Sequence, residues 1–372
     1  MFSCGLSWLA SPQPNSSSLA MDNISAMHAH SRIFRWLAAA LLFALASTIS
    51  LTKVHAQQNP EQDITAAKRL YPEIGAGVWS IKRGPAGHYY VLVGRSVLVF
   101  GDDQEKLKEI PPPTKDFRGA PPLVYGVAFD VDSAGRVYVA DRAANILRIF
   151  SPDGSSLLNI SFPAPTGIAV LPSGEIVAAS ANSNHLITVF DSRGRELRTV
   201  GDQVEFTENH TFNHFLNVGH LTADTANNIY FAFNYFPEPT FRKYDRAGYA
   251  QLDISLTTVE FAPAAQAARR EIKRETETGN VPELKPTVSC IGVDSATERV
   301  WLGFGNEIML FEKDGLPLAE YRLYTPDGGR LIMNSIMVEP ERLVISADPL
   351  GIYEFPRPDK LIPPYASTPK QF

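Results

Sequence analysis

Residues 126–154 read GVAFDVDSAGRVYVADRAANILRIFSPDG, and residues 167–194 read GIAVLPSGEIVAASANSNHLITVFDSRG. The two stretches superimpose about 40 residues apart, which pairs Gly126 with Gly167, Gly135 with Gly174, Phe150 with Phe190 and Gly154 with Gly194. Alternating β-branched and small side chains between glycine-containing turns are typical of short strands joined by tight hairpins. The pattern therefore predicts a repeated unit of four antiparallel strands.

The same unit recurs along the chain. A stretched copy lies at 219–248, where NIYFAF (228–233) matches RVYVAD (136–141). Three weaker copies have second strands at 88–93, 299–304 and 342–347, followed by third strands at 96–100, 307–311 and 351–355. Six copies with this period predict an all-β protein, a six-bladed β-propeller over residues 76–355.

The best copy resembles the NHL repeat family. The matching positions are Gly126, Ala128, Asp130, Gly135, Val137, Tyr138, Val139, Ala140, Asp141, Arg148, Ile149, Phe150 and Gly154. The resemblance implies the propeller architecture, and it does not imply an activity, because many functions share such folds.

Three segments depart from regular blades. Residues 261–279, with Pro263 near the start and Gly279 at the end, predict an inserted surface helix near 263–278. The last blade lacks a fourth strand before the proline-rich tail at 356–372, so within the N-terminal segment 57–75 we expect residues 64–74 to supply the ring-closing strand. The helix is interpreted either as a lid or partner contact, or as a solvated excursion whose alanine face rests on the propeller edge.

The N-terminal segment predicts export. Residues 27–35 carry Arg32 and Arg35, residues 36–51 are apolar and uncharged, and Val54 to Ala56 provide small residues for cleavage after Ala56. The uncharged run of 16 residues is shorter than the roughly 20 that span a bilayer, although a retained anchor is the alternative. Residues 27–56 are thus a predicted signal peptide of a secreted or periplasmic protein, and residues 1–26 are either disordered or a misassigned start.

Charge and cysteine content restrict the partners. Of 34 basic and 40 acidic residues, residues 1–56 hold three and one, which leaves a formal charge of −8 on the remainder. Such a surface repels phosphate backbones and anionic lipid, so nucleic acid is not an expected partner. The two cysteines are Cys4, upstream of the cleavage site, and Cys290 in an apolar run, where we expect a buried small side chain.

Histidines give the candidate site. His220 aligns by spacing with Val127 and Ile168 of neighbouring inner strands, so an imidazole replaces an aliphatic side chain. With His210 and His214 in the preceding loop it forms H-x3-H-x5-H, which predicts a metal site for zinc or calcium. The alternative is that these rings pack against aromatic neighbours. Tyr235 and Arg118 are further candidate ligand-binding residues.

Two enzyme families share the predicted architecture. The gluconolactonase-like enzymes bind metal through an acid in an E-G-P-x-W motif, whereas here residues 75–79 read GAGVW and place Ala76 at the acid. The peptidyl-hydroxyglycine amidating lyases place histidines around zinc at inner-strand positions of several blades, where only His220 fits and Val127, Ile168 and Ile291 do not.

The sequence leaves two functions open. The first is a binding or scaffold propeller without catalytic turnover that recognises a peptide, a glycan or a protein. The second is a metal-dependent lyase or hydrolase that uses His210, His214 and His220.

Overall fold

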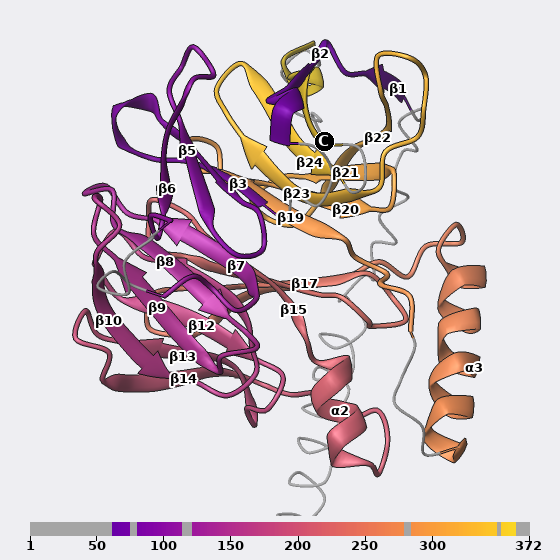
Figure 1. Cartoon of the computed structure of the whole chain (residues 1–372). Coiled ribbons are helices and arrows are strands. Elements are labelled where there is room, and N and C mark those ends of the chain that lie inside the picture. The colour runs from indigo at the N-terminus through magenta and orange to yellow at the C-terminus, as the bar shows by residue number, and fades with distance from the viewer. Residues whose placement is uncertain (1–61, 75–79, 114–120, 279–283, 348–350, 362–372) are drawn as a thin grey trace, which may run out of the picture. The chain divides into compact units, whose positions relative to one another are not determined.

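The computed structural model describes residues 62–74, 80–113, 121–278, 284–347 and 351–361. All of them belong to one compact unit, Gln58–Phe372. Six sheets make up this unit (Figure 1). The inner strands contact one another in the closed order β3, β7, β11, β15, β19, β23 and back to β3. The predicted six-bladed β-propeller is therefore confirmed.

Each sheet is one blade, numbered here one to six along the chain. Blades one and two consist of β3 (Ser80–Arg83), β4 (Tyr89–Leu92), β5 (Val97–Phe100), β6 (Lys106–Ile110), β7 (Gly126–Val131), β8 (Val137–Asp141), β9 (Ile146–Phe150) and β10 (Ser156–Ser161). Blades three and four consist of β11 (Pro165–Val170), β12 (Ile176–Ser180), β13 (His185–Phe190), β14 (Glu196–Asp202), β15 (Gly219–Ala223), β16 (Ile229–Phe233), β17 (Thr240–Tyr244) and β18 (Ala250–Ser255). Blades five and six consist of β19 (Cys290–Asp294), β20 (Arg299–Phe304), β21 (Glu307–Phe311), β22 (Pro317–Tyr324), β23 (Met333–Val338), β24 (Arg342–Ala347) and β25 (Gly351–Pro356).

The N-terminal segment completes the last two blades. The strand β2 (Lys68–Leu70) pairs antiparallel with β25 and is the outer strand of blade six. The strand β1 (Gln62–Thr65) pairs parallel with β22 and adds a fifth strand to blade five. The strand β2, which precedes the first blade, thus belongs to the same sheet as the three strands of the last blade. This pairing closes the ring of blades. Short 3₁₀ turns lie at Pro72–Ile74, Pro85–Gly87 and Pro358–Leu361.

The core lies in the seams between blades. Six apolar clusters occur, one for each pair of neighbouring blades. Phe231 and Trp301 are among the large side chains that are fully buried there. Burial of such a side chain contributes about 1.5–3 kcal/mol, so stability comes from contacts between blades that no single sheet could provide.

The hairpins between the first and second strands of blades two and four share a turn stabilised by an aspartate. In blade two, the Asp132 carboxylate accepts hydrogen bonds from the backbone N–H groups of Ala134 and Arg136 and from the Tyr138 hydroxyl. Asp224 makes the equivalent bonds in blade four. These carboxylates stabilise the hairpin between the first and second strands, so their role is structural.

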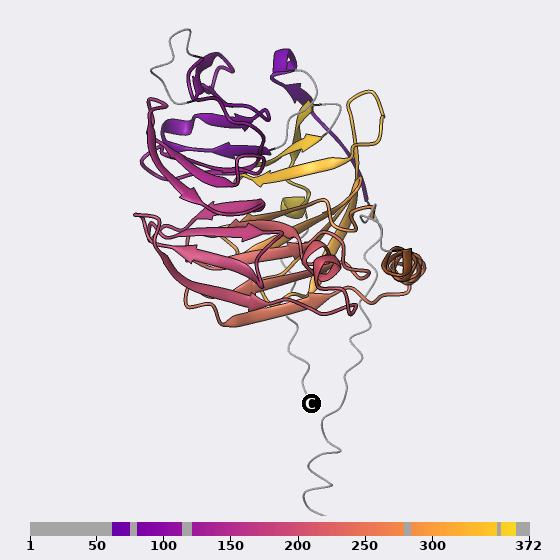
Figure 2. The same ribbon diagram turned by 60° about the horizontal axis from the view of Figure 1, so that its bottom comes forward.

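Two helices are inserted between blades. The helix α3 (Ala262–Thr278) lies between β18 and β19, where the sequence predicts it. The helix α2 (His210–Leu216) lies between β14 and β15, where the sequence predicts a loop. Both connections lead into an inner strand, so both helices lie on the face where the inner strands begin. Figure 2 views α3 almost end-on, beside the sheets. Among the described residues, no helix is long and apolar enough to cross a membrane.

Candidate functional site

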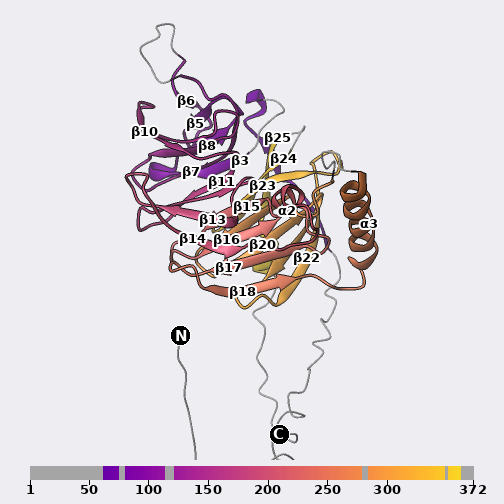
Figure 3. The same cartoon turned by 90° about the horizontal axis from the view of Figure 1, so that it is seen from below.

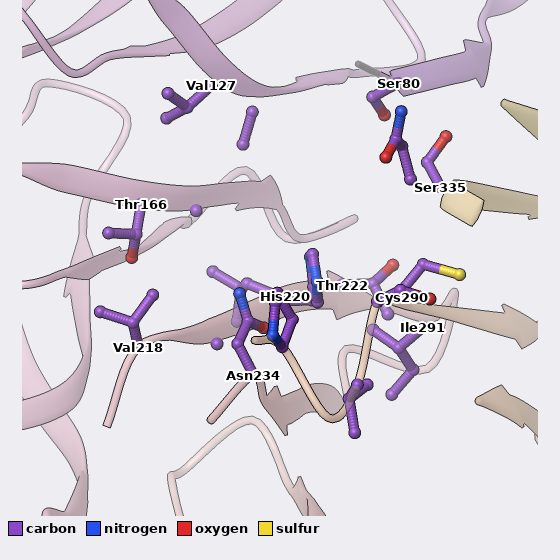
Figure 4. Close-up of a pocket in the computed structure, with 18 of the residues that line it drawn as sticks. Ser80, Val127, Thr166, Val218, His220, Thr222, Asn234, Cys290, Ile291 and Ser335 are labelled. Carbon is purple, nitrogen blue, oxygen red and sulfur yellow. The ribbon is translucent and has the colours of Figure 1, made fainter. Parts of the chain in front are cut away.

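A cavity of about 410 Å³ lies on the propeller axis. Every inner strand, from β3 to β23, contributes to its lining. Figure 4 shows Ser80 and Ser335 on one wall and His220 and Asn234 on the opposite wall. Because six separate blades converge here, this cavity can contact a ligand from all sides.

One level of the cavity wall is a ring of six equivalent residues. The strand ladders pair each of these residues with the same position of its second strand: Ser80 with Leu92, Ala128 with Ala140, Gly167 with Ala179, His220 with Ala232, Cys290 with Gly303 and Ser335 with Ser346. Five of the six side chains in this ring are small. They leave space at the axis, and the imidazole of His220 is the one large polar group that the ring contributes.

The strand pairing corrects which inner-strand residues are equivalent to His220. The sequence predicts that His220 is equivalent to Val127 and Ile168, whereas the ladders make it equivalent to Ala128 and Gly167. For Val127 the difference arises because the register shifts between Gly126 and Ala128, and no such shift occurs in β15. For Ile168 it arises because the spacing pairs Gly167 with Gly219, whereas the ladders make Gly167 equivalent to His220. A β-bulge adds one residue to a strand, so residue counting misplaces everything beyond it by one position.

Burial keeps the His220 imidazole neutral. Desolvation by burial lowers the pKa of His220 to about 4, because burial removes part of the hydration of the charged imidazolium. The ring retains some exposed area, which faces the cavity that it lines. The described lining contains no Asp or Glu, so no carboxylate there offsets the desolvation. At neutral pH the ring therefore offers one hydrogen-bond donor and one acceptor.

Several buried oxygens in the cavity wall lack a hydrogen-bond partner within the described chain, among them those of Thr166 and Asn234. Among the described residues, the Thr166 hydroxyl oxygen and the Asn234 side-chain oxygen are buried and make no hydrogen bond within the chain. Buried polar atoms are nearly always paired with protein or water, so such atoms beside a cavity indicate a partner from outside the chain. Sequence reasoning did not select either residue, because Thr166 lies in a bulge and Asn234 just beyond the end of β16.

The mouth of the cavity combines an aromatic ring and a cation. Tyr235 stacks on Phe215 of α2 with ring centroids 4.5 Å apart. Desolvation raises the pKa of Tyr235, and the nearby positive charge of Arg142 lowers it, so this phenol stays protonated at neutral pH. Within the described part of the chain, the Arg142 guanidinium forms no ion pair with a carboxylate. Arg118, the other cation predicted for this site, lies outside the described residues.

The structure separates the three predicted histidines. His210 begins α2 and is exposed, His214 lies in the last turn of the same helix, and His220 lies on β15. His220 and Tyr235 line the axial cavity, and the other two histidines do not. Among the described residues, no three His, Cys, Asp or Glu side chains are grouped to hold a metal ion. The three histidines therefore do not line one common space in the described structure.

Cys290 shares the ring level with His220. Burial raises the pKa of the Cys290 thiol to about 12, although a hydrogen bond with Ser289 opposes that rise. A thiol in this state is protonated at neutral pH and is a poor nucleophile or metal ligand. Its role in the wall is that of a small apolar side chain.

Comparisons with known proteins show the fold. No protein-family model matches the chain, and no curated protein matches it. The solved structures that resemble it include a streptogramin B lyase, with 15% sequence identity and a TM-score of 0.50 over 78% of this chain and 85% of that chain. They also include a virginiamycin B lyase from Staphylococcus aureus, with 16% identity and a TM-score of 0.48 over 78% of this chain and 87% of that chain. At this identity, the likeness to the streptogramin B lyase shows that this chain shares the six-bladed propeller fold.

Proposed function

We propose that this protein is an exported binding protein that holds a peptide or a glycan in its axial cavity. The unpaired buried oxygens of Thr166 and Asn234 in the cavity wall carry this proposal. Amides and hydroxyl groups are the ligand groups that would donate hydrogen bonds to them. The predicted signal peptide at 27–56 supports export.

The described wall of the cavity combines apolar side chains with neutral hydrogen-bonding groups. The Ser80 and Thr222 hydroxyls and the neutral His220 imidazole lie there with the unpaired oxygens. Two cations also belong to the described lining: Lys82, which lies 3.6 Å from Asp130, and Arg142 at the mouth. A neutral peptide backbone or a sugar fits such a wall better than a multivalent ion, which would need several charged partners.

The proposal can be tested by filling the cavity. Ala128 lies in the ring of small residues, and Ala128→Phe would place an aromatic ring on the axis. We expect the full-length protein to bind members of a panel of short peptides and oligosaccharides in calorimetric titrations. We expect Ala128→Phe to abolish that binding, with circular dichroism as the control for folding. Binding that survives in a folded Ala128→Phe variant would refute the axial site.

A lyase is the second candidate function, and His220 is the observation that favours it. Its neutral imidazole could accept a proton from a substrate, and the structure named above as a streptogramin B lyase is an enzyme with this fold. A general base works best when its pKa lies near the working pH, however, and a pKa of about 4 makes His220 a weak base. Binding is thus the better-supported function.

Mass spectrometry of the bound ligand separates the two candidates. We expect each ligand to be recovered intact after long incubation with the wild-type protein. Conversion of a ligand by the wild type, lost in His220→Gln, would establish the enzyme instead.

A further inference from the structure

A second cleft of about 560 Å³ lies between α3 and the edge of the propeller. Its walls are mostly apolar, with Ala264, Ala267 and Ala268 on the helix side and Pro239, Phe261 and Phe304 on the opposite side. Ala264 and Ala267 are exposed, so the alanine face of α3 is not covered by the blades. This face therefore borders an open apolar space.

Contacts at other points hold α3 beside that space. Ile272 is buried against Phe212 and Leu216 of α2, in a small cluster separate from the blade seams. Arg269 forms an ion pair with Glu238 at the propeller edge, with Nη2 and Oε2 2.6 Å apart. Figure 3 shows α3 at the edge of the ring, with α2 nearer its middle. The helix is anchored while its alanine face stays free.

The cleft adjoins the axial cavity. Tyr235 and Pro286 line both spaces. Tyr235 packs against the same α2–α3 cluster that anchors the helix. The cleft under α3 is therefore the space next to the axial cavity on the side of Tyr235.

The two spaces differ in chemistry, and this difference identifies a ligand class. The axial cavity presents hydrogen-bonding groups, whereas the cleft presents alanine, proline and phenylalanine side chains. The charged residues of the cleft, Glu271 and Lys285, have opposite signs and leave no net charge there. A ligand that matches both spaces has a polar backbone and an uncharged hydrophobic side chain. A peptide has this form, and a simple glycan lacks the hydrophobic group.

We propose that the cleft under α3 is the specificity site for a hydrophobic side chain of a peptide whose backbone lies in the axial cavity. This inference rests on the proposed binding function. Transfer of a phenylalanine-sized side chain from water into an apolar site is worth about 1.5–3 kcal/mol, which corresponds to roughly 10- to 100-fold in affinity.

The test compares two tryptophan substitutions on the same helix. Ala267→Trp fills the cleft, while Arg270→Trp places the same side chain on an exposed position outside the cleft lining. The probes are a pentapeptide with phenylalanine flanked by two glycines on each side, and pentaglycine. We expect wild type and Arg270→Trp to prefer the phenylalanine peptide by roughly 10- to 100-fold. Ala267→Trp should bind both peptides with the affinity of wild type for pentaglycine.

Different outcomes would overturn different claims. If Ala267→Trp keeps the preference for phenylalanine while Ala128→Phe abolishes binding, the axial site stands and the specificity cleft is wrong. If neither peptide binds the wild-type protein, both the peptide-binding function and this inference are wrong. Circular dichroism of both tryptophan variants verifies that α3 remains folded.

Discussion

Blades two and four have the same strand order but differ where the second strand ends. In blade two, Asp141 is fully buried and accepts hydrogen bonds from the backbone N–H groups of Val124 and Tyr125. In blade four, the ladders place Phe233 at this position, and Phe233 stacks on Phe236 with ring centroids 3.8 Å apart. The polar anchor of the loop that leads into the inner strand is therefore absent from the strand end of blade four.

The inserted helix α2 takes over that anchoring. The Asn217 amide bonds both the N–H and the carbonyl of Val204, and Asn213 accepts hydrogen bonds from the N–H groups of Phe206 and Thr207. Next to Phe233, the Asn234 oxygen faces the cavity wall without a partner in the described chain. The comparison shows that in blade four an insertion supplies hydrogen bonds that the strand end supplies in blade two.

The largest effect on the free energy of unfolding should come from replacing Asp141, the buried carboxylate that anchors the loop before the inner strand of blade two. Arg148 is also buried and lies 3.5 Å from Asp141, so Asp141→Ala removes the carboxylate that balances its charge and leaves it only the carbonyls of Pro121 and Pro122 as hydrogen-bond acceptors. We expect a loss of about 3–5 kcal/mol in the free energy of unfolding, measured by urea denaturation. Asp253→Ala, which breaks a surface pair with Arg242 in blade four, should cost about 0–1 kcal/mol. Equal losses would contradict this account of the anchor.

The next largest effect is the pH dependence of the free energy of unfolding that His220 contributes. The unfolded chain binds a proton at His220 near pH 6.5, but the folded chain does so only near pH 4, so the unfolded state binds more protons between these values. The folded state should therefore lose up to about 3 kcal/mol from this group as pH falls from 6.5 to 4. His220→Gln should remove this part of the pH dependence, which parallel denaturation curves of both proteins would measure. Parallel losses in both proteins would show that His220 does not contribute.

A smaller loss of stability is expected when Asn217, which anchors the loop before the inner strand of blade four, is replaced. Asn217→Ala removes the hydrogen bonds to Val204 and leaves buried backbone groups unpaired, at a cost of about 1–3 kcal/mol. Asn209→Ala removes only the N-cap bond to Phe212 and should cost about 1 kcal/mol. Thermal unfolding of the two variants measures the difference. A loss for Asn217→Ala below that of the cap variant would mean that α2 is not the anchor.

The smallest effect on stability should come from replacing Asn234. Asn234→Ala removes an oxygen that has no partner in the described chain, so we expect a change within about 0.5 kcal/mol. The same variant should bind the phenylalanine pentapeptide about 3- to 10-fold more weakly, because one hydrogen bond to the ligand is lost. Calorimetry and denaturation together separate the two effects. A destabilised variant with unchanged affinity would assign Asn234 a structural role.

The sequence allowed the blades to be predicted far better than the cavity. The second strands at 88–93, 299–304 and 342–347 were identifiable because alternation within a strand and spacing between strands are local signals. The ring around His220 was not, because bulges that shift the register by one residue leave no mark in the spacing. The seven-residue helix α2 was also missed, since a segment this short carries too little periodicity.

The central claim is that the imidazole of His220 is largely desolvated in the wall of the axial cavity and lines the proposed ligand site. Nuclear magnetic resonance of histidine-labelled protein tests it most directly, with the His220 signal assigned through His220→Gln. We predict a ring that titrates near pH 4 and whose resonances shift when the phenylalanine pentapeptide is added. A ring that titrates near pH 6.5 and does not respond to the peptide would contradict the account.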